Sequence, residues 1–405
     1  MPKKAAASDK DPFDDLPDDL LRRILYFLPG DDALQTCVLG TRWRDIWRDR
    51  TRLSFHYEGW SSPTFDRYEK LANLIIHVRG NSPLTYCEIN HFDVVGNPGT
   101  FTCTKQLIEY VLECQVKWLK VRPGLYHGER LQPEKYDDVP LPLDDRLISQ
   151  FLKTIEFQYV EFKHSSLDFS DCPKLQMLTI RDCSIYVRRI VSESLKYLQI
   201  IDGCTFPERS RIQIYTPRLI SLDLDCSDGG SDGLAPLLEK MPLLQSAFVM
   251  IGYTCLDYCD CDEPSCTCSD EDCVLLNGLS NAVHLQLTAE WKKSRFTWDL
   301  ASCPIFSKLR TLLLNEWFTA SDLVCILQHS PVLKRLTLTI DNAENFVGAT
   351  VPQETTEQPI LCASLLVVEI ECRKIDQGVR EILKILSTSG ILYKQISIKE
   401  RWKKH

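Results

Sequence analysis

The sequence predicts an α/β fold in which a small module of three short helices precedes an irregular repeat solenoid with a parallel sheet. Two observations carry this prediction: a compact helical signal in residues 13–55, and a short apolar motif that recurs from there to the end of the chain. Hydrophobic content of 44% and charged content of 25% over 405 residues are typical of a globular protein. A chain of this length can hold a repeat array with a small domain attached.

The first helix is expected within residues 14–28, DDLPDDLLRRILYFL. Pro17 suits a first turn, where its missing N–H costs nothing, and the acids after it favour the positive end of the helix dipole. One broad apolar stripe then follows at Leu20, Leu21, Ile24, Leu25 and Leu28. After Pro29 and Gly30, two shorter helices are expected around residues 33–39 and from Thr41 onward.

These three helices are too short to bury all of their apolar surface by themselves, because a core of about forty residues usually needs a partner or a staple. The remaining apolar surface either contacts another protein or packs against the rest of the chain. The spacing alone does not decide between these two possibilities.

The stretch LPDDLLRRILYFLPGDDALQTCVLGTRWRDIWR, from Leu16 to Arg48, resembles an F-box of the plant type that is followed by leucine-rich repeats. The resemblance implies a docking module for the small Skp-family adaptor of SCF-type ubiquitin ligases, and through the adaptor for a cullin. The adaptor-binding residues that it implies are Leu16, Pro17, Leu20, Leu21, Ile24, Leu25, Leu28, Val38 and Trp43. Replacement of Leu21 or Ile24 by Asp is then expected to abolish adaptor binding and to leave the repeats folded.

A motif of the form apolar–x–x–apolar–x–apolar recurs in twelve copies downstream, at an average interval of about 28 residues. The copies run from Leu84-Cys87-Ile89 to Tyr393-Ile396-Ile398, and Leu175-Leu178-Ile180 is among the clearest. In four copies a proline stands two residues before the first apolar position, at Pro173, Pro217, Pro242 and Pro331. Proline ends the preceding segment and favours extended backbone. The pattern therefore predicts a leucine-rich solenoid.

In such a solenoid, the middle and last apolar residues of each copy point into the core, and the residues beside them face the concave side of the parallel sheet. This concave side is the expected target-binding surface. Its candidate residues are Thr179, Arg181, Tyr197, Gln199, Asp223, Asn315, Arg335 and Thr337. For each single position, a solvated sheet face without a ligand is the alternative.

The predicted domains are a disordered tail (1–12), the F-box (13–55), the solenoid (56–360) and a C-terminal cap (361–405). Insertions at 122–145, 253–273 and 343–359 interrupt the repeats, and such long loops either recognise a partner or are slack. The C-terminal part reads strand–helix–strand and resembles the FBD-type region of plant F-box proteins. The resemblance implies that it caps the solenoid and shields its last apolar face.

Residues 253–273, YTCLDYCDCDEPSCTCSDEDC, hold six of the chain's eighteen cysteines. Three interpretations stay open: a mobile acidic loop, a zinc-stapled loop that uses Cys259, Cys261, Cys266 and Cys268, and a group of redox-sensitive thiols. Structural zinc sites usually pair their cysteines two to four residues apart, whereas this segment offers C-x-C pairs and no histidine. Zinc is therefore not the favoured interpretation, and no cofactor is expected.

The net charge of −9 argues against a nucleic-acid partner, because phosphate binding needs an excess of Lys and Arg. No apolar run of eighteen residues and no signal-like apolar segment occur, which predicts no membrane partner and a location in the cytoplasm or nucleus. The motifs of nucleotide-binding loops, zinc proteases and serine hydrolases do not occur either. We therefore expect a non-catalytic protein.

The leading hypothesis is a substrate-recognition subunit of an SCF-type E3 ubiquitin ligase, in which the F-box docks on the adaptor and the repeats hold a target protein for ubiquitination. Its contribution would be proximity, not bond chemistry. Two alternatives stay open. One is an interaction scaffold that acts outside ligase assembly, and the other is a small-molecule sensor, which converging Arg and Lys side chains on the concave face would favour.

Overall fold

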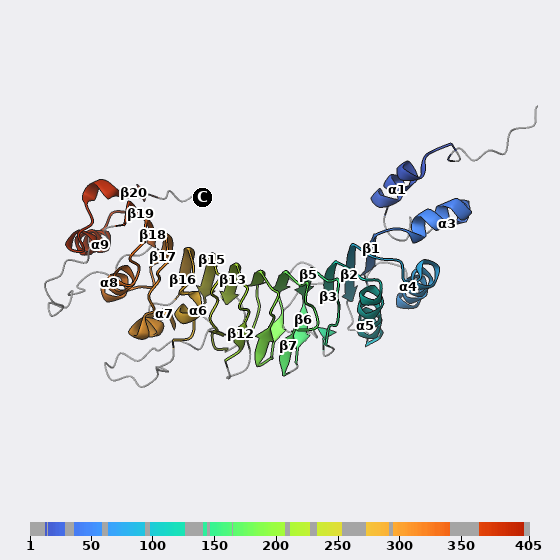
Figure 1. Cartoon of the computed structure of the whole chain (residues 1–405), viewed down its shortest axis with the longest axis horizontal. Helices are drawn as coiled ribbons and strands as arrows, with labels where there is room; N and C mark the ends of the chain where they lie inside the picture. Colours follow the sequence, from blue (N-terminus) through green and yellow to red (C-terminus); the bar gives the residue numbers. More distant parts are fainter. Residues whose placement is uncertain are drawn as a thin grey trace, which may run out of the picture. The chain divides into compact units, whose positions relative to one another are not determined.

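The computed structural model describes residues 13, 15–28, 36–58, 64–93, 98–125, 141–143, 146–163, 165–206, 211–226, 233–252, 273–290, 295–340 and 364–400. The chain divides into two compact units, Met1–Asp137 (unit 1) and Asp138–His405 (unit 2) (Figure 1). The boundary lies inside the predicted solenoid, so unit 1 joins the F-box to the first repeats. Most of the predicted insertions, at 126–140, 253–272 and 343–359, lie outside the described residues.

Unit 1 opens with three helical segments: α1 (Asp18–Phe27), the short 3-10 helix η1 (Thr36–Leu39) and α3 (Thr41–Arg48). Pro17 directly precedes α1, and two acidic residues lie in its first turn, as the sequence predicts. Of the second predicted helix, only the part at 36–39 is described, and it forms a 3-10 turn. α1 packs on the η1–α3 segment through a small apolar core that contains Leu21, Leu25, Trp43, Ile46 and Trp47.

Unit 1 continues as β1 (Arg52–Glu58), α4 (Phe65–Arg79), β2 (Tyr86–Asp93), α5 (Pro98–Glu113) and β3 (Trp118–Leu125). The three strands pair in parallel, and their register places Leu53, Cys87 and Leu119 side by side in the core. β1 is a repeat strand that the sequence prediction missed. The reason is that Arg50 stands where the motif has its first apolar residue, so the copy is not recognisable.

Unit 2 contains a long parallel sheet in which strands follow one another in chain order. Its strands are β5 (Thr154–Gln158), β8 (Met177–Arg181), β11 (Tyr197–Ile201), β13 (Ser221–Cys226), β15 (Ser246–Ile251), β16 (His284–Ala289), β17 (Thr311–Asn315), β18 (Arg335–Ile340), β19 (Val367–Cys372) and β20 (Ile396–Glu400).

The predicted apolar positions lie opposite one another along this sheet. One row of paired residues contains Ile155, Leu178, Leu198, Leu222, Ala247, Leu285, Leu312, Leu336, Val368 and Ile396. Together with the strands of unit 1, this register places every predicted copy of the motif on a strand. The alternation of buried and half-buried residues follows from the period of two in an extended chain.

The four prolines of the motif occupy one structural role. Each proline lies in a turn just before a strand. In this turn, the residue two places after the proline donates its backbone N–H to the carbonyl of the residue that directly precedes the proline. Examples are the hydrogen bonds from Leu175 to Cys172 (3.0 Å) and from Leu219 to Thr216 (3.1 Å). Proline is favoured at the second position of such a turn because its φ angle already fits. The turn brings the first leucine of each copy into the core, where Leu175 and Leu219 are completely buried.

A second layer lies on one side of the long sheet of unit 2 (Figure 1). In the earlier repeats it consists of short parallel strands: β4 (Leu141–Pro142), β6 (Val160–Phe162), β7 (Ser166–Asp168), β9 (Ser184–Ile185), β10 (Arg189–Val191), β12 (Gln213–Tyr215) and β14 (Leu237–Leu238). In the later repeats it consists of α6 (Leu276–Leu279), α7 (Arg295–Asp299), η2 (Leu300–Ser302) and α8 (Ala320–Gln328).

The C-terminal part has the expected strand–helix–strand order, with α9 (Gln377–Thr388) and the short η4 (Tyr393–Gln395) between β19 and β20. Asp376 starts α9 by accepting a hydrogen bond from the Val379 amide at 3.0 Å. Buried Val379, Ile382 and Leu386 attach the helix to the apolar core. Within the described residues, no helix combines the length and apolar character that a membrane span requires.

Candidate functional site

α1 carries a second apolar stripe, which the core of the F-box does not use. Leu20, Ile24 and Phe27 are 46%, 37% and 72% exposed, and spacings of four and three residues put them on one side of the helix. Leu21 and Leu25, in contrast, are completely buried. Because each residue advances about 100° around a helix, the two stripes diverge by about 100°. α1 therefore has one apolar face that is buried in its own module and a second one that is exposed.

The structure divides the residues predicted to bind the adaptor. Exposed are Pro17, Leu20 and Ile24; half-buried are Leu16 and Leu28; buried inside the F-box are Leu21, Leu25 and Trp43. Val38 lies in η1, and its side chain is outside the described part. Leu21→Asp would therefore place a carboxylate in the core of the module, where an unpaired charge is strongly unfavourable, and it does not test docking alone.

Four further exposed apolar residues, which the sequence analysis did not select, belong to the same module: Phe13, Tyr26, Phe27 and Leu39. Phe27 follows Leu20 and Ile24 at helical spacing, and this periodicity could have identified it. The exposure of Phe13 and Leu39 depends on how the segments before and after α1 fold. The sequence gives no comparable signal for them.

Arg42 on α3 fixes the segment that leads into α1. Its guanidinium donates to the Asp18 carboxylate at 2.6 and 2.8 Å, to the Phe13 carbonyl at 3.3 Å and to the Leu16 carbonyl. The Phe13 ring also meets the Trp43 ring edge to face, with centroids 5.4 Å apart. These contacts hold Leu16 and Pro17 at the start of the exposed stripe.

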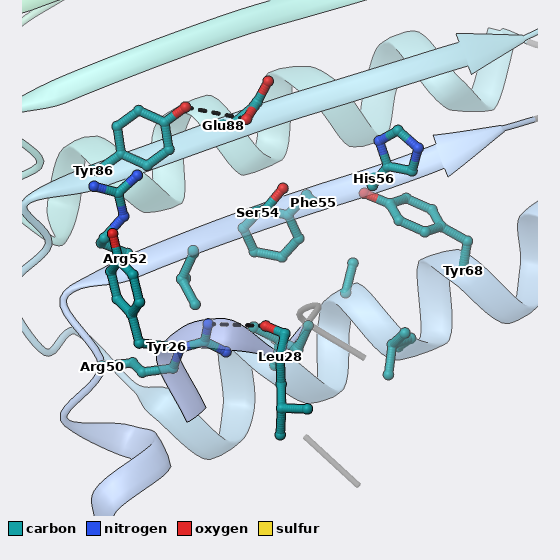
Figure 2. A pocket seen from close by; sticks show the side chains of 14 residues that line it. Tyr26, Leu28, Arg50, Arg52, Ser54, Phe55, His56, Tyr68, Tyr86 and Glu88 are labelled. Atoms are coloured by element: carbon teal, nitrogen blue, oxygen red, sulfur yellow. Dashed lines mark hydrogen bonds between the residues drawn. The ribbon is translucent and has the colours of Figure 1, made fainter. Parts of the chain in front are cut away.

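A pocket of about 550 Å³ lies in unit 1, between β1, the end of α1 and α4. Figure 2 shows Arg52 between the rings of Tyr86 and Tyr26; its guanidinium carbon is 4.3 Å and 5.6 Å from the two ring centroids. Arg50 donates to the carbonyl of Leu28 at 3.3 Å, and Tyr86 donates to the Glu88 carboxylate at 3.1 Å. The pKa of Arg50 is lowered, mainly by burial and to a smaller extent by the positive charge of nearby Arg52.

A hollow of about 450 Å³ lies on the exposed face of the long sheet of unit 2, across β13 and β15–β18. The strand register arranges its lining residues in two parallel rows. The first row is Ser221, Ser246, His284, Thr311 and Arg335, and the second row is Asp223, Phe248, Gln286, Leu313 and Thr337. Phe248 and Leu313 make the second row partly apolar. In the first row, Ser246 bonds to Ser221 at 2.9 Å and His284 to Thr311 at 2.7 Å.

Three of the predicted target-binding residues, Asp223, Arg335 and Thr337, thus line one hollow. Burial is the main reason why the pKa of the Asp223 carboxyl is raised, and the hydrogen bond from Gln199 opposes this effect. The sequence analysis missed the other seven residues of the two rows: Ser221, Ser246, Phe248, His284, Gln286, Thr311 and Leu313. They occupy the same places in their repeats as the selected residues, so a strict application of the motif register would have found them.

The other predicted target-binding residues take part in contacts within the sheet. Thr179 donates to Gln199 at 3.1 Å, and Arg181 forms an ion pair with Asp202. Asn315 bonds both backbone groups of Ala289, at 2.7 and 2.9 Å, and extends the pairing of β16 and β17. Tyr197 is exposed on β11. The predicted zinc ligands Cys259, Cys261, Cys266 and Cys268 lie outside the described residues.

The geometry defines a class of protein: a leucine-rich solenoid preceded in the chain by a small helical module with an exposed apolar stripe. The family model of the F-box domain matches residues 13–55. Among similar proteins, a putative F-box/FBD/LRR-repeat protein of Arabidopsis thaliana is 29% identical over 45% of this chain and 42% of its own length. From the same plant, an F-box/LRR-repeat protein and an FBD-associated F-box protein are each 25% identical, over 80% and 82% of this chain and 69% and 78% of their own lengths.

These findings show an F-box domain at residues 13–55 and a similarity of the chain to plant F-box proteins with leucine-rich repeats. F-box proteins are generally non-catalytic adaptors, and their F-box implies binding to a Skp-family adaptor. The resemblance to plant F-box/leucine-rich-repeat proteins and the predicted α/β fold class are both confirmed.

Proposed function

We propose that this protein is the substrate-recognition subunit of an SCF-type ubiquitin ligase. Its F-box docks on a Skp-family adaptor, which links it to a cullin, and its repeats hold a target protein close to the ubiquitin-loaded enzyme. The observation that carries this proposal is the exposed stripe of Leu20, Ile24 and Phe27 on a helix that lies within the matched F-box domain. We place the activity in the cytoplasm or nucleus from the composition of the chain.

Docking through this stripe follows from its chemistry. An amphipathic helix that presents apolar side chains at helical spacing fits an apolar groove of a partner. The adjoining Leu16 and Pro17 are held in place by Arg42, so the surface is organised before it binds. Preorganisation lowers the entropy that association costs.

Target binding is assigned to the hollow on the sheet of unit 2. Phe248 and Leu313 of its second row can bury apolar side chains of a short protein segment, and the polar residues of both rows can pair the segment's polar groups. Among the described residues that line the hollow, Arg335 is the only Arg or Lys. This composition supports a protein target over an anionic small molecule at this place.

The test is co-expression with a plant Skp-family adaptor, followed by size-exclusion chromatography and a measured dissociation constant. Ile24→Asp should weaken adaptor binding by about 30-fold or more, because loss of an interface anchor costs about 2 kcal/mol or more. Ile375→Asp is the matched control, since Ile375 is 39% exposed, close to the 37% of Ile24, and lies in unit 2. Equal affinity of wild type and Ile24→Asp would contradict the proposal.

The scaffold alternative predicts a different result from the same material. A soluble chain that elutes apart from the adaptor at micromolar concentrations would favour a scaffold outside ligase assembly. The small-molecule alternative has one observation in its favour, the pocket of unit 1 with Arg50, Arg52 and three tyrosines. Arg52→Ala should then leave adaptor binding unchanged and abolish any ligand-dependent thermal stabilisation of the chain.

A further inference from the structure

Cys303, Cys325 and His329 form a cluster in the later repeats of unit 2. One potential ligand atom from each residue lies within 4.8 Å of the others, and all three side chains are half-buried. In a tetrahedral zinc site, bonds of about 2.3 Å to sulfur and about 2.1 Å to nitrogen put neighbouring ligand atoms about 3.5–3.8 Å apart. The cluster is therefore close to the size of a metal site.

Local folding brings these side chains together. Cys325 lies on α8 and His329 directly after its last residue, so a spacing of four residues puts both on one side of the helix. Cys303 follows η2, which packs against α8. The cluster thus joins two elements that are consecutive in the second layer of the solenoid.

Cys273 is joined to the same part of the fold, although its sulfur is not among the ligand atoms that lie within 4.8 Å of one another. The three residues after it, Val274, Leu275 and Leu276, donate their backbone N–H groups to the Asp299 carboxylate at 3.0, 2.6 and 2.9 Å. Asp299 directly precedes η2, and Cys303 directly follows it. Cys273 is half-buried, and movement of its side chain toward the cluster on metal binding would supply the fourth ligand of a closed site.

We propose that Cys273, Cys303, Cys325 and His329 bind one Zn²⁺ as a structural Cys₃His site. Thiolate and imidazole ligands prefer zinc over magnesium or calcium, and four protein ligands leave no open position for catalysis. Binding displaces the thiol protons to solvent, and no oxidant or reductant takes part. The site connects α8 and η2 to the end of the acidic cysteine-rich segment, whose last cysteine is Cys273.

One detail of the surroundings supports this assignment. Nδ1 of His329 lies 2.8 Å from the carbonyl oxygen of Cys325, and donation of its proton there leaves Nε2 with a lone pair. Metal-binding histidines are commonly oriented by such a hydrogen bond to a backbone carbonyl.

The site differs from the one that the sequence alone suggests. Cys259, Cys261, Cys266 and Cys268 are close in sequence, but their C-x-C pairs do not have the usual spacing of zinc ligands. Apart from Cys325 and His329, which are four residues apart on one side of α8, the proposed ligands are separated by more than twenty residues and come together through the repeat fold. A periodic solenoid can align such positions, whereas a search for short-range cysteine motifs cannot detect them.

The experiment uses the full chain, co-purified with its adaptor without chelators. Zinc is measured by elemental analysis, and Co²⁺ is then exchanged in as a spectroscopic probe. We expect about one Zn²⁺ per chain and visible absorption bands of tetrahedral cobalt–thiolate coordination. Cys325→Ser and His329→Ala should each lose the metal, whereas His329→Cys, which offers four thiolates, should retain it and keep the cobalt bands.

Two controls separate the alternatives. A variant with Cys259, Cys261, Cys266 and Cys268 all changed to Ser should keep its metal, and so should Cys372→Ser, whose buried thiol lies on β19. Circular dichroism checks that each variant is folded. The proposal is overturned by a wild-type chain that binds neither Zn²⁺ nor Co²⁺, or by metal loss in the fourfold variant combined with retention in His329→Ala. A Cys303–Cys325 disulfide in the mass spectrum of the native chain would overturn it as well.

Discussion

His91 on β2 is a buried imidazole whose two ring nitrogens are both occupied. Thr104 donates its hydroxyl proton to the Thr100 carbonyl at 2.8 Å, so its oxygen accepts the Nδ1 proton of His91 at 2.7 Å. Nε2 then accepts a hydrogen bond from the Tyr68 hydroxyl. A neutral imidazole satisfies this network, and a protonated one does not. Burial, assisted by nearby His56, lowers the pKa of His91 from 6.5 to about 3.

This pKa predicts a specific dependence of stability on pH. Below pH 6.5 the unfolded chain binds a proton at His91 and the folded chain does not, so the stabilisation present above pH 6.5 is lost progressively towards pH 3. At pH 5.5 the loss should be about 1.4 kcal/mol. Urea denaturation at pH 7.5 and 5.5 measures it. The difference should shrink in His91→Gln and persist in His284→Gln, an exposed control; an unchanged difference in His91→Gln would assign the effect to other groups.

Asp299 is a second buried charge with a definite role. It is completely buried, pairs with equally buried Arg295 at 2.9 Å, and accepts the three backbone N–H groups that begin α6. Asp299→Asn should lower the free energy of unfolding by about 3–5 kcal/mol, because it removes the carboxylate charge from a fully buried ion pair with Arg295. The measurement is the urea midpoint of the full chain. Asp202→Asn, in an exposed ion pair, should cost about 1 kcal/mol or less.

α1 shows how much of an element the sequence determines. The 3.6-residue period predicts the helix, and Pro29 predicts its end, as the structure shows; Pro17, expected in the first turn, lies just before it, and the helix begins at Asp18. The sequence does not separate the stripe of Leu21 and Leu25 from that of Leu20 and Ile24. Both stripes are made of similar apolar residues, and only the position of α3 decides which one is buried. Tertiary contacts, which the sequence pattern does not contain, therefore determine the docking surface.

For the strands, too, the sequence predicts some features of the fold and misses others. The motif predicts twelve strands because leucines at fixed spacing have to face the core. It misses β1, where Arg50 takes an apolar position, and it misses the short strands of the second layer, which have only two or three residues each. The cluster of Cys303, Cys325 and His329 is only partly visible in local patterns: Cys325 and His329 are four residues apart, but the repeat fold brings Cys303 to them.

The adjacent residues Leu20 and Leu21 allow a direct test at the level of the helix. Leu21→Ala removes a completely buried side chain and should lower the free energy of unfolding by about 2–5 kcal/mol. Leu20→Ala should change it by no more than about 0.5 kcal/mol, because this side chain is 46% exposed. Adaptor affinity, measured on folded protein, should instead fall with Leu20→Ala. If Leu20→Ala affects stability as strongly as Leu21→Ala, the assignment of the two stripes is wrong.

At the scale of the whole molecule, two surfaces carry the proposed function: the exposed stripe of α1 in unit 1 and the hollow of unit 2. The regular register of the long sheet is what builds the hollow. Asp223, Phe248, Gln286, Leu313 and Thr337 are far apart in the sequence, yet each is the direct neighbour of the next across the strands. Variation of these positions changes the surface and leaves the buried rows of the sheet intact.

Phe248 is the aromatic residue of the hollow, and aromatic anchors often dominate interface energies. Phe248→Ala should therefore weaken target binding by about 30-fold, which corresponds to about 2 kcal/mol, and it should leave adaptor binding unchanged.

Quantitative profiling of ubiquitinated proteins in plant cells checks this prediction. Proteins that lose ubiquitin both with Phe248→Ala and with Ile24→Asp, but not with Leu243→Ser, are the targets held by the hollow. Leu243 is a suitable control because it is 56% exposed and lies in the turn before β15, outside the lining. If Phe248→Ala leaves the ubiquitination profile as it is in wild type while Ile24→Asp alters it, targets bind elsewhere on the repeats.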